Sequence, residues 1–413
     1  MQAHTLFEMQ SMTINAQAIV PAAIAPVQAM HPDPVARARA LGPLITANAA
    51  VIEKSRRIPE PLLTELHASR LLRLLLPRSV GGEQAEPRDY FRAIAEVARH
   101  DASLAWNIFV ANSTVLIAPF LDLEVARSIF ANPRTLLAWG PPNACRAKAV
   151  PGGYRVSGRW DFASGCRQAN WMGVHANVEE ADGSLRLNRF GRPTVRTLLF
   201  PASQAVLIDT WTTIGLCGTG SDSYTVDDLF VGEAFSSTRE DPTLRRESGP
   251  LYAFTMQGLY AVGVAGVALG TARAMHQAFV TLAAAKTPRS QGRLADSPTV
   301  QAEVARNEAK LAAATAYLDA TLTDIYATAD DHAIISIADR GRVRLACAHA
   351  IHAALDVADT CYKAAGVDAI FPGAPFERRF RDIHTLSQQI QSRSQHFEAV
   401  GQILLGHPAE SFL

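Results

Sequence analysis

The spacing of apolar residues changes twice along this chain of 413 residues, and this change restricts the folds that the chain can adopt. From about Pro34 to Ala131, and again from about Gly249 onward, apolar residues recur with a period near 3.6, which is typical of helices with one buried face. Between about Leu136 and Ala234 apolar and polar residues alternate, as they do in half-buried strands. Helices, then strands, then helices predict an α+β fold rather than alternating βαβ units.

These changes of period divide the chain into four expected parts. Residues 1–30 are predicted to form a flexible tail, 31–134 an N-terminal helical domain, 135–240 a central antiparallel β domain, and 241–413 a C-terminal four-helix bundle. The bundle is expected from four helical patterns, which cover residues 248–272, 300–325, 343–361 and 397–405. Asp101 is expected to cap the helix that follows it, because its carboxylate can accept a free backbone N–H.

Composition excludes several classes of partner. The chain has 39 Lys and Arg residues and 39 Asp and Glu residues, so it lacks the basic surface of a nucleic-acid binder. Its five cysteines are scattered without a C-x-x-C pair, which excludes a zinc ribbon and favours free thiols in a reducing cytoplasm. No Lys or Arg precedes Arg37, so no secretory signal is expected.

One uncharged stretch, from Ser248 to Ala272, is long enough to span a bilayer. It contains Gln257 and the glycines Gly258, Gly263, Gly266 and Gly270, and small residues of this kind favour close contact between helices in a protein core. We therefore expect a buried helix here, and a cytoplasmic protein that binds neither a membrane nor a metal ion. The chain also lacks the G-x-x-x-x-G-K-[ST] and G-x-S-x-G motifs, which disfavours nucleotide hydrolases and α/β-hydrolases.

Six local motifs follow one another in an order that resembles the acyl-CoA dehydrogenase superfamily. Within that superfamily they are most similar to the two-component (group D) flavin-dependent monooxygenases. The motifs are LPRSVGG (76–82), DASLAW (101–106), GGYRVSGRWDFASG (152–165), WTTIGLCGTGSDSYTVDDLFV (211–231), RFRDIH (379–384) and GQILLG (401–406). The resemblance therefore covers residues 35–406 and implies the three-domain acyl-CoA dehydrogenase fold.

The two branches of the superfamily differ in one acidic residue. Common dehydrogenases carry a Glu base nine residues before the Asp of an Arg-Asp pair, to remove a proton while hydride moves to the flavin. Here Asp382 is that Asp, the corresponding position is Gly373, and the nearest acid is Glu377. Other dehydrogenases place the base on the glycine-rich helix, which is uncharged from Ser248 to Ala272. The dehydrogenase base is missing, which favours the monooxygenase branch.

The resemblance implies an oxygenase that takes reduced FMN, or FAD, from a separate NAD(P)H flavin reductase. It would react with O2 through a C4a-hydroperoxyflavin and oxygenate an aromatic or heteroaromatic small molecule in a dry pocket. The family assembly implied is a homotetramer. Two other functions stay open: an acyl-CoA dehydrogenase with bound FAD, and a non-catalytic scaffold of the same fold.

The resemblance also implies a set of site residues. Ser164 is expected at the N5 edge of the flavin, and Gln389 occupies the position where phenol-hydroxylating relatives carry a histidine, with His384 as a possible substitute. The flavin-binding candidates are Trp139, Phe162, Ser164, Gly165, Gly218, Thr219, Ser221 and Arg289, the last reaching a neighbouring subunit. The substrate-binding candidates are Trp106, Asn112 and Ser113.

Each of these residues also has a purely structural interpretation. Ser164 could be a buried serine that only satisfies a backbone group, and GTGSDS could be an ordinary β-turn. Arg293 competes with Arg289 for the contact to flavin, and either arginine could be a solvated loop charge.

Overall fold

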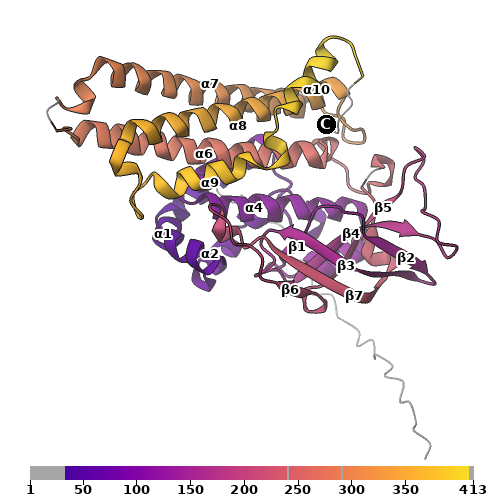
Figure 1. Ribbon diagram of the computed structural model, residues 1–413. Helices are drawn as coiled ribbons and strands as arrows, with labels where there is room; N and C mark the ends of the chain where they lie inside the picture. The colour runs from indigo at the N-terminus through magenta and orange to yellow at the C-terminus, as the bar shows by residue number, and fades with distance from the viewer. Residues whose placement is uncertain (1–32, 240, 290–291, 409–413) are drawn as a thin grey trace, which may run out of the picture. The chain divides into compact units, whose positions relative to one another are not determined.

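The computed structural model describes residues 33–239, 241–289 and 292–408, all within one compact unit. The tail expected over residues 1–30 lies outside the described residues. Helices come first, then strands, then helices again, so the chain has the α+β fold class that the apolar pattern predicts (Figure 1). The domain boundaries at 134/135 and 240/241 stay a prediction.

The N-terminal part is helical, and its central helix is buried on all sides. The helix α4 (Ala102–Thr114) packs against α3, α6 and the strand β1, so all of its residues are buried. The Asp101 carboxylate accepts the backbone N–H of Leu104 at 2.7 Å, which confirms the predicted cap. The other helices of this part are α1 (Pro34–Ser55), α2 (Glu60–Ala68), α3 (Pro87–Ala98) and α5 (Leu123–Phe130).

Among the described residues, eight strands form one sheet in the middle of the chain, in the order β6-β7-β3-β2-β4-β5-β8, with β1 paired to β4. The strands are β1 (Leu137–Trp139), β2 (Arg146–Val150), β3 (Gly153–Ala163), β4 (Trp171–Glu179), β5 (Val195–Pro201), β6 (Val206–Ile208), β7 (Asp222–Gly232) and β8 (Ser236–Ser237). The long strands β3 and β7 pair antiparallel and carry two of the recognised motifs.

The sheet is mixed, so the prediction of an antiparallel β domain was wrong in part. The strand β4 runs parallel to both β1 and β2. The strands β2 and β3 form an antiparallel pair, and β4 lies on the other side of β2. After β3 the chain passes to the other side of β2 and reverses its direction as it enters β4. The strand β4 therefore runs opposite to β3 and in the same direction as β2. Alternation of apolar residues indicates a strand but carries no information on the direction of its neighbour.

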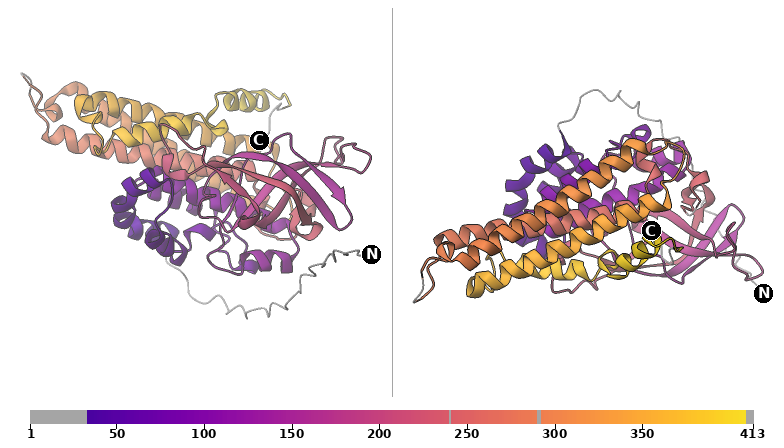
Figure 2. Two further views of the ribbon diagram at one scale, coloured as in Figure 1. Left: turned by 60° about the horizontal axis from the view of Figure 1, so that its bottom comes forward. Right: turned by 90° about the horizontal axis from the view of Figure 1, so that it is seen from above.

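Three long helices lie side by side in the C-terminal part, α6 (Met256–Ala285), α7 (Pro298–Thr328) and α8 (Ile337–Ala365) (Figure 2). The fourth helical pattern, over residues 397–405, corresponds to the helix α10 (Gln395–Leu404), and a further short helix that was not predicted, α9 (Glu377–Ser387), precedes it. The helix α9 packs against α6 and α8, and α10 packs against α8. A 3-10 turn, η11 (Ile390–Ser392), separates them.

The glycines of α6 allow it to approach the N-terminal helices closely. A Cβ added to Gly263 would lie 2.6 Å from the Tyr90 hydroxyl, and one added to Gly270 would lie 2.1 Å from the backbone oxygen of Ala95. Both α6 and the segment Ala102–Phe120 are long and apolar enough to cross a membrane, but 89% and 94% of their apolar windows are buried inside the protein. The uncharged stretch is therefore a core helix, as expected.

Candidate active site

Three buried hydroxyl groups form a continuous row where β3 ends and β7 begins. The oxygens of Ser164 and Ser221 are 2.7 Å apart, and those of Ser221 and Thr219 are also 2.7 Å apart. The Thr219 hydroxyl donates to the backbone oxygen of Leu216 at 2.8 Å. All three side chains are buried, with Ser164 only 8% exposed. The FASG and GTGSDS motifs, which are far apart in the sequence, therefore meet at one polar row in an otherwise apolar interior.

The backbone around Ser164 bends sharply, which brings this row together. Phe162 has φ of +62° and Gly165 has φ of +77°, both in the left-handed region that disfavours side chains. The Gly165 N–H donates to the backbone oxygen of Thr219 at 3.0 Å and so joins the two motifs. The Asp222 carboxylate accepts the backbone N–H groups of Thr210 and Trp211, each at 3.0 Å, which fixes the start of β7.

The helix α4 contributes two side chains to the same place. The indole N–H of Trp106 donates to the Ser164 hydroxyl at 3.0 Å. The Asn107 amide donates to the backbone oxygen of Gly218 at 3.2 Å, and this bond leaves its Oδ1 atom buried without a partner. Gln168 also has a buried oxygen without a partner, and it lines the same small cavity of about 20 Å³ beside Ser164. A cavity of this size has room for about one water molecule.

The bundle holds this site through Asp382 on α9. The Asp382 carboxylate accepts the backbone N–H of Leu216 at 2.6 Å. A Cβ added to Gly215 would lie 2.1 Å from the backbone oxygen of Arg381, so only glycine permits this close approach. Burial, together with the nearby Asp101 carboxylate, raises the pKa of Asp382 to about 7. The loop that carries Thr219 and Ser221 is thus positioned by a buried carboxyl group of another domain.

An exposed apolar surface lies next to the hydroxyl row. Phe162 is 63% exposed, although Ser164, two residues later, is buried. Ile214 is 70% exposed, although Leu216, two residues later, is buried. The ring of Phe162 meets the edge of Trp211, with centroids 6.1 Å apart. A planar apolar ring could cover these side chains while its edge faces the Ser164 hydroxyl. The residues present therefore fit an isoalloxazine, which has such a face and a hydrogen-bonding edge.

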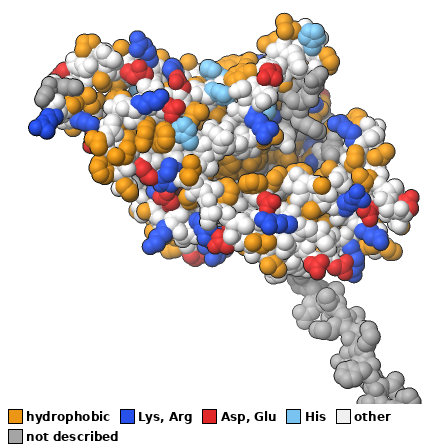
Figure 3. Space-filling model, viewed as in Figure 1, with side chains coloured by type: hydrophobic (Ala, Val, Ile, Leu, Met, Phe, Trp, Pro, Cys, Tyr) orange, Lys and Arg blue, Asp and Glu red, His pale blue; other side chains and the backbone are white. Residues whose placement is uncertain are grey.

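Trp139 lies at the end of β1 and is half-buried. The Arg239 guanidinium lies 5.0 Å from the centre of its ring, and the His175 ring contacts it edge-on at 4.9 Å. Arg239 also contacts the sulfur of Met256, at the start of α6. Figure 3 shows a hollow near the centre of the molecule, with apolar side chains on its floor, between the α9 and α10 region and the sheet.

The two catalytic candidates are His384, on α9, and Gln389, just before η11. Their contacts in the structure are with residues other than Ser164. The His384 Nε2 atom lies 2.8 Å from the Asp359 carboxylate on α8, and its ring packs against Phe380. The Gln389 side-chain oxygen accepts the backbone N–H of Gln391 at 2.6 Å and so caps η11. Catalytic roles for both residues stay predictions.

Two substrate candidates on α4 are engaged in backbone contacts. The Asn112 amide accepts the N–H of Leu75 and donates to the backbone oxygens of Leu71 and Ile108. The Ser113 hydroxyl donates to the backbone oxygen of Phe109 at 2.9 Å. The Asn112 bonds join α4 to the segment of Leu71 and Leu75, whereas the Ser113 bond stays within α4, and contact of either residue with substrate is untested.

Gly218 and Arg289 have different surroundings. A Cβ added to Gly218 would lie 2.4 Å from the Ile52 side chain, so this glycine allows packing against α1. Arg289 is exposed in the connection between α6 and α7, which lies at the end of the bundle farthest from the sheet (Figure 1). Arg293, its competitor, forms an ion pair with Asp296 at 2.8 Å. A contact of Arg289 with flavin would therefore need a second subunit.

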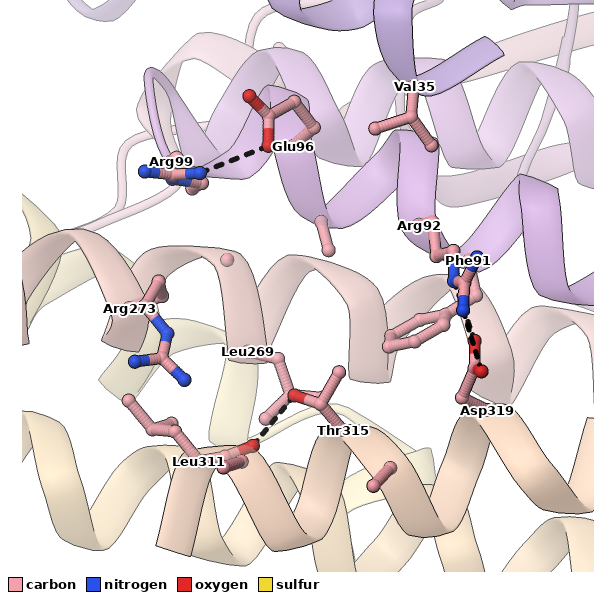
Figure 4. Close-up of a pocket in the computed structure, with 14 residues that line it drawn as sticks. Val35, Phe91, Arg92, Glu96, Arg99, Leu269, Arg273, Leu311, Thr315 and Asp319 are labelled. Atoms are coloured by element: carbon pink, nitrogen blue, oxygen red, sulfur yellow. Dashed lines mark hydrogen bonds and ion pairs between the residues drawn. The ribbon is translucent and has the colours of Figure 1, made fainter. Parts of the chain in front are cut away.

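A larger groove of about 480 Å³ lies elsewhere, between α3, α6 and α7 (Figure 4). Its charged side chains already form ion pairs. Arg92 pairs with Asp319 at 2.7 Å, and Arg99 pairs with Glu96 at 3.2 Å. None of the residues predicted for the active site lines it. In the described part of the chain, no group of three or more His, Cys, Asp or Glu side chains could hold a metal ion.

Comparison with known proteins gives the same picture over nearly the whole chain. Residues 262–393 match the family model for the acyl-CoA dehydrogenase C-terminal domain. The indole-3-acetate monooxygenase of Pseudomonas putida is 29% identical over 394 residues, which cover 92% of this chain and 96% of that protein. The oxygenase component of an FADH2-dependent resorcinol hydroxylase from Rhizobium sp. is 27% identical over 391 residues, covering 90% and 92%.

A solved structure, XiaF from Streptomyces sp. in complex with FADH2 and glycerol, superposes with a TM-score of 0.84. It is 24% identical and covers 92% of this chain and 96% of its own. The chain has the acyl-CoA dehydrogenase-like fold, and its residues 262–393 resemble the C-terminal domain of that family. The relatives that match over nearly the whole chain are monooxygenases or oxygenase components of monooxygenases.

Sequence reasoning missed three side chains near the site. Asn107 directly follows Trp106, the last residue of the DASLAW motif. A polar residue at this position of a buried helix could have indicated a polar contact. Arg239 and Tyr260 carry no signal of this kind, because only the fold brings Arg239 to Trp139 on β1 and Tyr260 to Phe109 on α4.

Proposed function

We propose that this protein is the oxygenase component of a two-component flavin-dependent monooxygenase that acts on an aromatic or heteroaromatic small molecule. Reduced flavin, when bound, supplies the electrons that activate O2. Ser164, Phe162, Gly165, Thr219, Ser221 and Trp139 would hold the flavin. The FADH2 named for the resorcinol hydroxylase component and seen with XiaF supports FAD as well as FMN as the cofactor.

The hydroxyl of Ser164 is the observation that carries the proposal. It accepts the indole N–H of Trp106 and shares a hydrogen bond with Ser221, so its oxygen and its proton have defined directions. A hydroxyl held in this way can keep a hydrogen bond to the edge of a flavin ring, and the buried surroundings keep water from replacing it. Retention of a proton at that edge suppresses the release of hydrogen peroxide.

The acyl-CoA dehydrogenase alternative is disfavoured by the acids that the structure places on α9. Glu377, the nearest candidate for a base, forms an ion pair with Arg381 at 2.5 Å. Arg381 is in turn paired with Glu53 at 2.6 Å. Both oxygens of the Glu377 carboxylate accept hydrogen bonds from the Arg381 guanidinium.

We also propose a separate NAD(P)H flavin reductase as partner, a homotetrameric assembly and a cytoplasmic location. The word "component" in the name of the resorcinol hydroxylase relative supports the reductase. The position of Arg289 at the outer end of the bundle supports a contribution to a second subunit. All five cysteines are free, which supports a reducing compartment.

The test uses the full-length protein mixed anaerobically with reduced FMN or FADH2 and then with O2. The proposal predicts that flavin reoxidation is much slower than in free solution and that little hydrogen peroxide appears. The variant tested beside the wild type is Ser164→Ala. Its matched control is Ser237→Ala, since Ser237 is a buried serine that donates to the Phe120 backbone oxygen at the far edge of the sheet. Reoxidation at the rate of free flavin, with full release of peroxide, would contradict the proposal.

A further inference from the structure

The hydroxyl row of Thr219, Ser221 and Ser164 ends at a backbone carbonyl group, that of Leu216. The Thr219 hydroxyl oxygen lies 2.8 Å from the Leu216 oxygen. A carbonyl oxygen carries no proton, so two oxygens at this distance attract each other only if Thr219 donates. A hydroxyl group has a single proton to donate, and the proton of Thr219 is therefore committed to Leu216.

This commitment determines which atoms donate in the rest of the row. The oxygens of Thr219 and Ser221 are 2.7 Å apart, and because the Thr219 proton is already used, Ser221 is the donor and Thr219 the acceptor. The oxygens of Ser221 and Ser164 are also 2.7 Å apart. Since the Ser221 proton is used as well, Ser164 is the donor in this second bond. All three protons thus point along the row toward the Leu216 carbonyl.

The Leu216 carbonyl is itself held in place. Leu216 has φ of +51°, in the left-handed region. Its N–H donates to the Asp382 carboxylate at 2.6 Å, and its oxygen also accepts the indole N–H of Trp211 at 2.9 Å. A row with the opposite order of donors would leave the oxygens of Thr219 and Leu216 2.8 Å apart with no proton between them, and two such lone pairs repel each other.

The order of donors leaves Ser164 with acceptor capacity only. Its oxygen accepts the indole N–H of Trp106 at 3.0 Å and its proton goes to Ser221, so one lone pair is left. In the proposed site this oxygen faces N5 of the flavin. N5 carries a proton in reduced flavin, whereas in oxidised flavin it carries only a lone pair. An acceptor at this point favours the reduced form and repels the oxidised form.

We propose that Thr219 is a positioning residue: its bond to Leu216 keeps the Ser164 hydroxyl turned as an acceptor and so makes the site select reduced over oxidised flavin. The effect of Thr219 on Ser164 passes through Ser221. The inference rests on the proposed function, in which Ser164 lies at N5, and adds the direction of each hydrogen bond. Selection of this kind suits an oxygenase supplied by a separate reductase, because oxidised flavin is then exchanged for reduced flavin.

The experiment measures two dissociation constants on the full-length protein by calorimetry. Oxidised FMN is titrated in air and reduced FMN under anaerobic conditions, and the pair is repeated with FAD. Neither titration involves turnover. The wild type should bind the reduced form of at least one flavin about tenfold or more tightly than its oxidised form, because two acceptors oppose each other at the oxidised edge. That flavin is then used for the variants.

Thr219→Val removes the hydroxyl and keeps the shape of the side chain. Ser221 then loses its acceptor and can turn its proton to Ser164, which frees the Ser164 proton for N5 of oxidised flavin. The preference for reduced flavin should fall about fivefold or more, mainly through tighter binding of the oxidised form. A purely structural role would weaken both forms equally. Thr219→Ser keeps the hydroxyl and should keep the wild-type preference.

Thr271→Val is the matched control. Thr271 is also a buried threonine whose hydroxyl donates to a backbone oxygen at 2.8 Å, but the acceptor is Val267 within α6. This variant should keep the wild-type preference. If Thr219→Val does not fold, Ser221→Ala replaces it. That substitution removes the acceptor of the Ser164 proton, so the preference for reduced flavin should fall in the same way.

Two results would overturn the inference and leave the proposed function standing, because flavin still binds in both. One is equal affinity of the wild type for oxidised and reduced flavin. The other is a wild-type preference that persists in Thr219→Val, or in Ser221→Ala where that variant replaces it. A wild type that binds neither FMN nor FAD in either redox state would overturn the inference and the proposed function together.

Discussion

The indole N–H of Trp106 donates to the hydroxyl oxygen of Ser164 at 3.0 Å. This bond joins the buried helix α4 to the end of strand β3, and in it the Ser164 oxygen is the acceptor. With one lone pair of Ser164 occupied by Trp106 and a second bond shared with Ser221, little freedom is left for the hydroxyl. A hydroxyl that is to keep one direction at the edge of a flavin must itself be held by contacts with other side chains, as Trp106 and Ser221 hold Ser164 here.

Trp106→Phe should weaken this control without removing the ring. The substitution deletes the donor and keeps the aromatic contact with Phe109, so we expect a loss of about 1 kcal/mol in the free energy of unfolding. We also expect more hydrogen peroxide per O2 consumed when reduced flavin is supplied. Denaturant unfolding and a peroxide assay measure the two effects. Unchanged peroxide release would show that the Trp106 bond does not orient Ser164.

Asp382→Asn should change how stability depends on pH. The pKa of Asp382 is about 7 in the folded protein against an ordinary value of 3.8, so the folded state binds its proton more tightly than the unfolded state. The stabilisation linked to this proton is fully present below pH 4 and is lost as pH rises through about 7, with a slope of up to about 1.4 kcal/mol per pH unit. Asn should remove this part of the slope.

The measurement for Asp382 is the free energy of unfolding between pH 4.5 and 7.5. Asp101, whose pKa burial also raises, and the charges of Arg378 and Glu53 face Asp382 and stay in place in the variant. The difference between variant and wild type therefore isolates Asp382. Asp356→Asn, on the exposed face of α8, is the control and should leave the profile unchanged. Parallel profiles for wild type and Asp382→Asn would contradict the assignment.

Gly215→Ala should destabilise the junction between the bundle and the hydroxyl row. The added Cβ would meet the Arg381 backbone at 2.1 Å, and the clash should cost about 1–3 kcal/mol in the free energy of unfolding. Gly232→Ala is the matched control, because nothing lies within 4 Å of a Cβ at that glycine. Thermal unfolding compares the two. A neutral Gly215→Ala would mean that α9 and the loop do not pack as closely as described.

Short sequence patterns predicted the parts of the site that are formed by residues close together in the sequence. The Asp101 cap, the buried glycine-rich helix and the motifs around Ser164 and Ser221 are all visible in short stretches of sequence. The parallel pairing of β4 with β2 was not predicted, because strand order depends on contacts between distant segments. The direction of the hydrogen bonds in the hydroxyl row was not predicted either. A sequence shows that Thr219 and Ser221 carry hydroxyl groups, but it does not show which of them donates to the other.

The most direct test of the account is the fate of O2 in Ser164→Ala. The full-length variant and the wild type are each given the same reduced flavin anaerobically and then mixed with O2, while flavin reoxidation and hydrogen peroxide are followed. The account predicts faster reoxidation and a higher peroxide yield in Ser164→Ala, with Ser237→Ala behaving like the wild type. Equal rates and equal peroxide yields in Ser164→Ala and the wild type would contradict the central role of the Ser164 hydroxyl.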